Sequence, residues 1–251
     1  LGNSRNQNVL NCAIEILSSG GFTVNTRVLE AERLGVPQRR RRMFIVARKG
    51  PAPFHFGWLG QGAACHGLKR TLLGLEEGQL GHNPKYFKSG SNHEKIARRI
   101  GPGQKLCNVR VGESAIPTWE IPEVFGAVSG SEVEVLEVIQ RLRRTQRVRD
   151  YGDADPVPLF RIEKALGRAP SVEIAQLLSK GYLRIINDEY DLTNTFNGKY
   201  RRLNLDGVSP TVDTRFGDPR LFLHPIENRG MTVREAARIQ GFADNFVFDK
   251  D

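Results

Sequence analysis

The sequence has few cysteines and no long apolar run. Its three cysteines, Cys12, Cys65 and Cys107, are odd in number and widely spaced, which excludes a regular disulfide framework and fits a reducing compartment. No apolar stretch approaches the roughly 20 residues of a membrane-spanning helix, and the start of the chain lacks the regions of a signal peptide. We therefore expect a soluble cytoplasmic protein without a membrane partner. Because the first residue is Leu1 and not methionine, we expect a fragment or a processed chain.

Acidic residues are the minority among the charges. Lysine and arginine number 37 against 28 aspartates and glutamates, which gives a net charge of +9 and a pI near 9.7. Such an excess suits a polyanion or an anionic membrane surface. The 251 residues, 39% of them hydrophobic, are enough for a core, and we expect two folded units.

Residues 1–50 alternate between helical and strand-like patterns. Val9, Ala13, Ile16 and Leu17 form a helical stripe that ends at a glycine pair. Residues 22–29 alternate as a strand does, and the short apolar run 43–47 is typical of a strand covered on both faces. This order predicts the end of an α/β sheet.

From residue 51 to about residue 130 glycine and proline are frequent and periodicity is weak, which predicts a separate, loop-rich unit. The second domain is expected to comprise residues 51–213. Within them, residues 131–203 predict an insert similar to a winged helix. It consists of helices over 129–149, 157–166 and 171–180, followed by a hairpin that turns at Asn197-Gly198. Residues 214–251 predict a return segment. Its helix over 231–241 is capped by Thr232, with Glu235 completing a capping box.

Four consecutive arginines stand before the apolar run, in GVPQRRRRMFIVARKG at residues 35–50. In an extended chain Arg40 and Arg42 share one face, and Arg39 and Arg41 take the other. A guanidinium pair at a strand entrance indicates that an anion or a polar ring is received there, because arginine offers fixed donors without a proton to lose. A solvated basic turn is the alternative interpretation.

The residues around these arginines resemble a known family. Glu30-Ala31 followed by residues 35–42 resembles the eighth conserved motif of the DNA cytosine-5 methyltransferases. Residues 229–242, RGMTVREAARIQGF, resemble the ninth motif, and residues 209–212, SPTV, resemble the threonine-containing dipeptide near the end of the family's target-recognition region. Two long motifs in the right order make this a specific resemblance.

The resemblance implies a fold and a reaction. The fold would be α/β, the end of a Rossmann-like S-adenosylmethionine-dependent methyltransferase sheet, with a smaller α+β target-recognition domain that carries the winged-helix-like insert. The reaction would move a methyl group from S-adenosylmethionine to carbon 5 of a cytosine flipped out of double-stranded DNA, as in restriction-modification. By the resemblance Arg42 reaches the base, Arg40 holds the catalytic loop, and Gln38 fixes the turn.

A second set of residues is assigned to DNA contact. Exposed arginines near a duplex bind phosphate, although an ordinary solvated basic face remains an alternative for each of them. The DNA-binding candidates are Arg39, Arg41, Arg141, Arg144, Arg147, Arg202, Thr211 and Arg215.

The sequence also lacks parts that the family needs. None of the three cysteines follows a proline, as the family's nucleophile does. The cofactor strand and the nucleophile would precede Leu1, so we expect no cofactor-binding residue here and no turnover by the isolated chain. We expect a missing amino-terminal half, on the same chain or on a separate subunit. The Cys and His residues at 65, 66, 82, 93 and 107 do not have zinc-ligand spacing, and no metal is expected.

Two other interpretations stay open. The chain is a DNA-recognition subunit of a split methyltransferase, or it is a non-catalytic winged-helix DNA-binding module. Trp119 either stacks on a base or packs in the core, and its apolar and proline neighbours favour the core.

Overall fold

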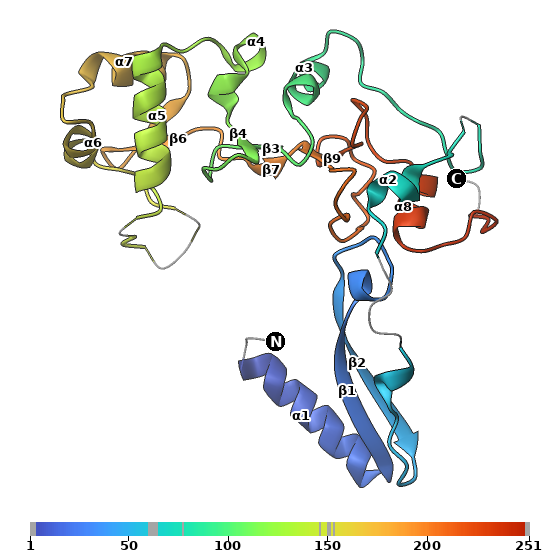
Figure 1. Cartoon of the computed structure of the whole chain (residues 1–251). Helices are drawn as coiled ribbons and strands as arrows, with labels where there is room; N and C mark the ends of the chain where they lie inside the picture. The colour runs from blue at the N-terminus through green and yellow to red at the C-terminus, as the bar shows by residue number, and fades with distance from the viewer. Residues whose placement is uncertain are drawn as a thin grey trace. The chain divides into compact units, whose positions relative to one another are not determined.

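The computed structural model describes residues 4–59, 65–76, 78–145, 147–149, 152 and 154–248, and they form two compact units (Figure 1). Unit 1 consists of Leu1–Leu75, Leu205–Asp213 and Arg234–Asp251. Unit 2 consists of Glu76–Asn204 and Thr214–Val233. These boundaries differ from the predicted ones at residues 50 and 213, because unit 1 continues to residue 75 and residues 205–213 return to it.

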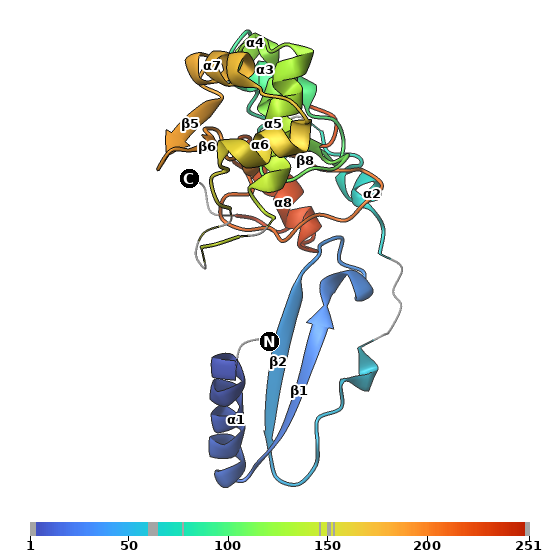
Figure 2. The same ribbon diagram turned by 90° about the vertical axis from the view of Figure 1, so that its left-hand side faces the viewer.

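Unit 1 is built on one helix and a two-stranded ribbon. Helix α1 (Ser4–Ser19) contacts strand β1 (Phe22–Glu30), which pairs antiparallel with β2 (Arg41–Lys49). Both views show α1 alongside the ribbon (Figures 1 and 2). The predicted helix and first strand are therefore confirmed. The other elements of this unit are η1 (Ala31–Arg33), η2 (Phe56–Trp58), α2 (Leu68–Leu72) and most of α8 (Val233–Ile239).

Unit 1 exposes apolar side chains that the sequence pattern predicts to be buried. The prediction that residues 43–47 are covered on both faces is wrong for the described chain, since Phe44 is 47% exposed and Ile45 is 41% exposed. On α1, Val9 and Ile16 are also exposed, although they belong to the predicted stripe. A ribbon of two strands with a single helix beside it has too little surface to cover both faces. Unit 1 therefore exposes apolar side chains on α1 and β2 that its other described residues do not bury.

Unit 2 contains three small sheets and most of the helices. The sheets have the strand orders β4-β3-β7, β5-β6 and β8-β9. The strands are β3 (Lys105–Cys107), β4 (Ala115–Ile116), β5 (Leu183–Ile186), β6 (Glu189–Leu192), β7 (Asn197–Lys199), β8 (Arg201–Arg202) and β9 (Phe222–Leu223). The helices are α3 (Asn92–Arg99), η3 (Thr118–Glu120), α4 (Pro122–Phe125), α5 (Gly130–Leu142), α6 (Leu159–Leu166) and α7 (Ser171–Ser179).

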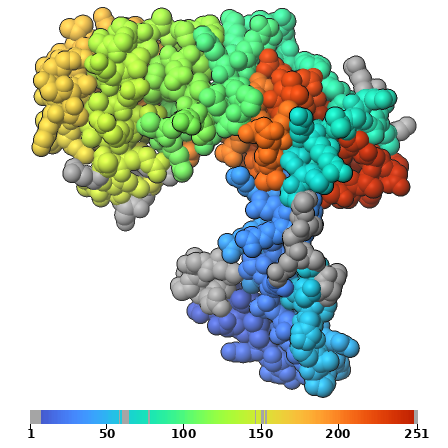
Figure 3. Space-filling model, in the orientation of Figure 1, coloured from blue at the N-terminus to red at the C-terminus, as the bar shows by residue number. Residues whose placement is uncertain are grey.

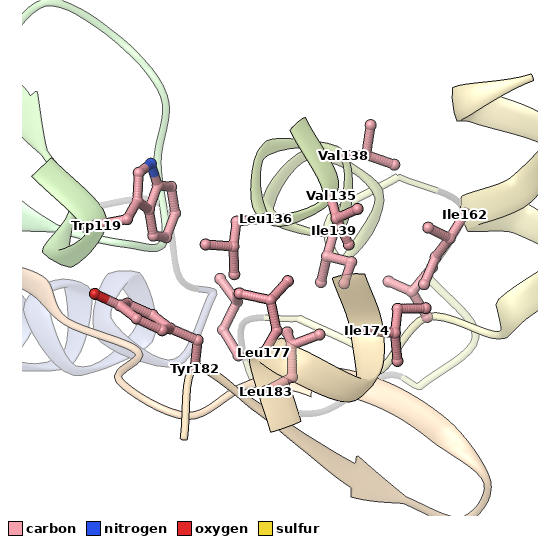
Figure 4. Close-up of a cluster of buried hydrophobic side chains, with 12 residues drawn as sticks. Trp119, Val135, Leu136, Val138, Ile139, Ile162, Ile174, Leu177, Tyr182 and Leu183 are labelled. Carbon is pink, nitrogen blue, oxygen red and sulfur yellow. The ribbon is translucent and has the colours of Figure 1, made fainter. Parts of the chain in front are cut away.

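The larger core of unit 2 lies among α5, α6, α7 and the β5-β6 hairpin. Leu136, Ile139 and Leu177 point toward one another at its centre (Figure 4). Trp119 closes one side together with Tyr182, whose hydroxyl donates to the Gly126 carbonyl at 2.8 Å. The prediction that Trp119 packs in the core is confirmed. In the space-filling view these elements form one continuous body (Figure 3).

Helix α5 begins as predicted and ends early. Ser129 and Glu132 form the capping box, each side chain bonded to the other's backbone N–H. The predicted helix over 129–149 is wrong in its second half, since α5 ends at Leu142. There the Thr145 hydroxyl donates to the Leu142 carbonyl at 3.1 Å, and Arg143 turns inward to pair with Asp191. A buried ion pair and a local side-chain bond thus override the helical pattern.

The hairpin turn is at a different place from the predicted one. Strands β5 and β6 turn at Asn187 and Asp188, whose φ angles are 49° and 61°, as a tight two-residue hairpin turn requires. The Asn197-Gly198 pair instead opens β7, which pairs with β3. The helices and hairpin therefore end at Leu192, and the strands within residues 193–203, β7 and β8, belong to other sheets. The winged-helix identity of this part stays a prediction.

Candidate functional site

The arginine loop, residues 35–42, is held by its own backbone. Gly35 has a positive φ of 85°, which lets the chain turn after η1. The Gln38 N–H donates to the Val36 carbonyl at 2.7 Å and the Arg40 N–H to the Gln38 carbonyl at 2.9 Å, giving two successive three-residue turns. The Ala31 N–H donates to the Arg40 carbonyl at 2.9 Å and closes the loop. The chain therefore enters β2 from a loop that is held by its own backbone hydrogen bonds.

A second segment, residues 209–211, lies along this loop. The Arg39 N–H donates to the Ser209 carbonyl at 2.8 Å, and the Ser209 N–H donates to the Pro37 carbonyl at 3.0 Å. The Thr211 hydroxyl donates to the Arg39 carbonyl at 2.7 Å, across 172 positions of sequence. The structure thus brings together the two sequence segments that resemble the eighth motif and the threonine-containing dipeptide.

Helices α2 and α8 support the same part of unit 1. The Leu68 N–H donates to the Gly207 carbonyl at 2.9 Å, which ties the start of α2 to the chain that leads into the 209–211 segment. Arg238 of α8 donates to the Leu73 carbonyl at 2.6 Å, at the end of α2, and forms an ion pair with Asp244. The arginine loop is therefore one part of a bonded assembly of four chain segments.

The four arginines do not separate into the predicted pairs. A hollow of about 230 Å³ is lined by Val28, Arg41, Arg42 and Met43, and Arg40 is not among its lining residues. Arg40 is half-buried, while Arg39, Arg41 and Arg42 are exposed. The strand begins only at Arg41, so the strict alternation of an extended chain does not apply to Arg39 and Arg40. Arg41 thus lies beside Arg42 at this hollow, and the role predicted for Arg40 stays a prediction.

The charged side chains that line the hollow are the guanidinium groups of Arg41 and Arg42. The Arg42 guanidinium donates to the Arg41 carbonyl at 2.8 Å. The Arg41 Nε lies 3.7 Å from the Glu30 Oε1, which makes a long ion pair. Guanidinium donors suit a ring or group on which negative charge develops. They do not suit the sulfonium cation of S-adenosylmethionine, and the expectation that this chain contributes no cofactor-binding residue stays a prediction.

Gln38 is the most buried side chain of the arginine loop. It is 1% exposed, and its Oε1 has no hydrogen-bond partner among the described residues. An unsatisfied buried acceptor costs about 1–3 kcal/mol of stability. The turn itself is made by backbone bonds, so the role predicted for the Gln38 side chain stays a prediction.

The assignment of Arg202 to DNA contact is wrong. Its side chain is 5% exposed and donates all its hydrogen bonds inside unit 2. The acceptors are the carbonyls of Ala97 (2.8 Å), Ile100 (2.6 Å), His224 (2.8 Å) and Glu227 (2.9 Å) and the Asn228 side chain (2.6 Å). Burial lowers the pKa of this guanidinium. Arg202 therefore ties the end of α3 to the turn that follows β9.

The other arginines predicted to bind DNA lie at the surface. Arg141 and Arg144 are exposed near the end of α5, and Arg215 is exposed in unit 2. Arg147 is exposed too, but it lies beyond the end of α5 and therefore not on a helix, although the predicted helix over 129–149 included it. Their contact with DNA stays a prediction.

Nearby Arg149 is already engaged by an acid. It donates to Asp155 at 2.8 Å, and its hydrogen bond, with those from the Val148 and Arg149 N–H groups, lowers the pKa of Asp155 to about 2. The Asp155 carboxylate therefore stays charged at neutral pH and orders the chain that follows α5. This pairing leaves Arg141 and Arg144 as the better candidates for phosphate contact.

Sequence reasoning missed several arginines that act as internal braces. Arg143 is buried against Asp191, Arg229 donates to the Gly230 carbonyl at 2.9 Å, and Arg234 donates to the Phe246 carbonyl at 2.8 Å. Arg229 and Arg234 lie in the segment that resembles the ninth motif. A signal was present, since both stand among apolar and small residues in a segment with clear helical periodicity. Residues 229–242 therefore contribute an internal hydrogen bond to unit 2 through Arg229 and one to unit 1 through Arg234.

The three cysteines lie in different environments. Cys107 is buried in β3 and Cys12 is exposed on α1. Burial, with a smaller contribution from the charge of Glu32, raises the pKa of the Cys65 thiol, which disfavours the reactive thiolate. Among the described residues no group of three or more His, Cys, Asp or Glu side chains is placed to hold a metal ion. None of their helices is long and apolar enough to cross a bilayer.

Comparison with known proteins confirms the resemblance seen in the motifs. Residues 1–99 match the family of C-5 cytosine-specific DNA methylases. The chain is 26% identical over 245 residues to the Type II methyltransferase M.HgiCI of Herpetosiphon aurantiacus, covering 93% of this chain and 57% of the relative. It is 27% identical over 257 residues to the Type II methyltransferase M.BanI of Aneurinibacillus aneurinilyticus, covering 95% and 60%. The chain thus spans little more than half the length of these relatives.

A solved structure is also similar, at a lower level. It is a candidate DNA modification methyltransferase encoded within a prophage of E. coli, 16% identical, with a TM-score of 0.41 over 97% of this chain and 56% of the other. At that score the likeness bears on neither the fold nor the function.

Proposed function

We propose that this chain is the carboxyl-terminal half of a DNA cytosine-5 methyltransferase. The observation that carries the proposal is the packing of the arginine loop against residues 209–211, within a chain whose residues 1–99 match the C-5 cytosine-specific DNA methylases. In this proposal unit 1 supplies the groups around the target base and unit 2 recognises double-stranded DNA. The nucleophilic cysteine and the S-adenosylmethionine site belong to the amino-terminal half.

The chemistry gives the arginines a role in the transition state. When a thiolate adds to carbon 6 of a flipped cytosine, electron density moves onto the ring nitrogen and the exocyclic oxygen. Guanidinium donors fixed beforehand stabilise that charge more than they stabilise the neutral ring. Arg42 lines the hollow of unit 1 and is the residue proposed to donate to the base, with Arg41 beside it. S-adenosylmethionine supplies the methyl group in the complete enzyme.

Loss of Arg42 tests this assignment. Arg42→Ala in the enzyme reconstituted with its amino-terminal half should lower the methylation rate more than tenfold, which corresponds to about 1.4 kcal/mol or more of transition-state stabilisation. The measurement is transfer of labelled methyl groups from S-adenosylmethionine to duplex DNA under single-turnover conditions. Arg48→Ala is the matched control, because Arg48 is exposed on the same strand and is not among the residues that line the hollow. Equal rates for the Arg42 and Arg48 variants would remove Arg42 from the site.

Surface arginines of unit 2 are proposed to contact phosphates. Replacing both Arg141 and Arg144 with alanine should weaken DNA binding equally across sequences. It should also reduce the slope of log affinity against log salt by about 1–2, since each phosphate contact contributes about 0.9 to the slope for duplex DNA. Titration at several salt concentrations measures it. Arg168→Ala is the control, because Glu134 and Glu173 already pair with Arg168. An unchanged slope in the double variant would leave these arginines as surface charge.

The exposed apolar side chains of unit 1 favour a catalytic half over an isolated DNA-binding module. Val9 and Ile16 on α1, with Phe44 and Ile45 on β2, are exposed by 41–70% among the described residues. Large exposed apolar side chains on several elements suit an interface. We propose that the amino-terminal half covers them, either from the same chain or as a separate subunit. A non-catalytic winged-helix module would not need this surface.

A further inference from the structure

The Thr211 hydroxyl is already occupied within unit 1. It donates to the Arg39 carbonyl at 2.7 Å. A hydroxyl has one proton to donate, and phosphate oxygens of DNA accept hydrogen bonds without donating them. Thr211 therefore cannot donate to a phosphate while it holds Arg39, which conflicts with the DNA-contact role that the sequence suggested for it.

The bonded carbonyl belongs to the peptide that orients the arginines. The Arg39 residue is fixed on both sides, because its N–H donates to Ser209 and its carbonyl accepts from Thr211. The Arg40 N–H, in the same peptide unit as that carbonyl, donates to Gln38. Rotation of this peptide would turn Arg40 and shift the start of β2, where Arg41 and Arg42 line the hollow. The 209–211 segment is thus placed to set the orientation of the whole arginine loop.

The chain path adds a connection to recognition. Residues 205–213 are a part of unit 1 that is preceded and followed along the chain by unit 2, which ends at Asn204 and resumes at Thr214. A displacement of either end by unit 2 would reach the arginine loop through Ser209 and Thr211. This connection is direct, because Ser209 and Thr211 are hydrogen-bonded to Arg39 itself.

We propose that Thr211 is a positioning residue that holds the arginine loop for catalysis through the Arg39 carbonyl, and that unit 2 acts on the reaction through the 209–211 segment. This inference rests on the proposed methyltransferase function. It changes the role of Thr211 from DNA contact to support of the groups that meet the base. A misplacement of about 1 Å in such groups can cost on the order of 100-fold in rate.

The test uses two substitutions in the reconstituted enzyme. Thr211→Val keeps the shape and the β-branched side chain but removes the hydroxyl, whereas Thr211→Ser keeps the hydroxyl. Thr211→Val should lower kcat about tenfold, with KM for DNA and the salt slope of binding unchanged within twofold. Thr211→Ser should keep kcat within threefold of the original protein. Hydrogen exchange of the peptide 36–42 should be at least fivefold faster in Thr211→Val than in Thr211→Ser.

Three outcomes would overturn the inference. A weaker DNA affinity with a salt slope lower by about one and an intact kcat would return Thr211 to DNA contact. Unchanged kcat and unchanged exchange in Thr211→Val would show that the hydroxyl holds nothing. Loss of kcat in Thr211→Ser with an intact kcat in Thr211→Val would point to packing of the side-chain methyl group. Hydrogen exchange does not depend on turnover, so failure of the methyltransferase proposal would appear separately, as absence of methyl transfer by the unsubstituted protein.

Discussion

Arg202→Met should lower the free energy of unfolding of the protein by about 3–5 kcal/mol, because several buried acceptors lose their donor at once. The substitution keeps an apolar stem of similar length but removes five N–H donors. It removes the guanidinium donor from the carbonyls of Ile100, His224 and Glu227 and from the Asn228 side chain, while the Ala97 carbonyl keeps the Ile100 N–H at 3.2 Å. Each unsatisfied buried acceptor costs about 1–3 kcal/mol, and the costs do not add fully because the site relaxes. Urea unfolding followed by circular dichroism measures the change.

Arg110→Met is the matched control for this prediction. Arg110 is an exposed arginine of the same unit, and its replacement should change stability by no more than about 0.5 kcal/mol. If Arg202 bound DNA, as the sequence suggested, Arg202→Met would instead leave stability nearly unchanged and weaken DNA binding. That pattern would contradict the internal role described for it.

Gly230→Ala should destabilise the protein by about 1–3 kcal/mol or more, because the added methyl group has no room. A Cβ at Gly230 would lie 2.4 Å from the Gly217 carbonyl oxygen and 3.2 Å from the ring of Pro219. These atoms are backbone or ring atoms that cannot move aside as the end of a flexible side chain can. Gly230 therefore allows two backbone segments to approach closely at the start of the segment that resembles the ninth motif. Thermal unfolding of the purified variant provides the measurement.

Gly130→Ala is the control for Gly230→Ala. A Cβ at Gly130 would meet nothing within 4 Å, in the first turn of α5. This replacement should be neutral or stabilising by up to about 1 kcal/mol, because alanine restricts the unfolded chain. If the two variants had equal stability, the close approach of residues 217 and 230 would not describe the protein in solution.

The sequence predicted the elements of this fold better than their burial. Periodicity located α1, β1, α5, α6 and α7 and the cap of α5, because these signals are local. The predicted burial of residues 43–47 was wrong. A continuous apolar run shows that a strand is suited to burial, but it does not show whether other elements cover its two faces. The sequence pattern also placed the hairpin turn at Asn197-Gly198, because Asn-Gly is a stronger hairpin signal than the pair Asn187-Asp188, where the turn lies. Pairing partners distant in sequence decided between them.

The candidate site was predictable in part for the same reason. The motif resemblance identified the segments that contain Arg39 and Thr211, but not that the Thr211 hydroxyl bonds the Arg39 carbonyl. Arginine composition suggested DNA contact for Arg202 and missed the internal roles of Arg143 and Arg234. A guanidinium in a sequence looks the same whether it faces phosphate or buried carbonyls. Only the fold distinguishes the two.

Methyl transfer by the two halves together tests the central claim most directly. This chain, the amino-terminal half of the enzyme and their mixture would each be incubated with duplex DNA and labelled S-adenosylmethionine. We predict that neither half alone labels the DNA and that the mixture does, because the proposed function puts the base-contacting arginines and the nucleophile on different halves. Labelling by this chain alone, or a mixture that binds DNA but transfers no methyl group, would contradict the account.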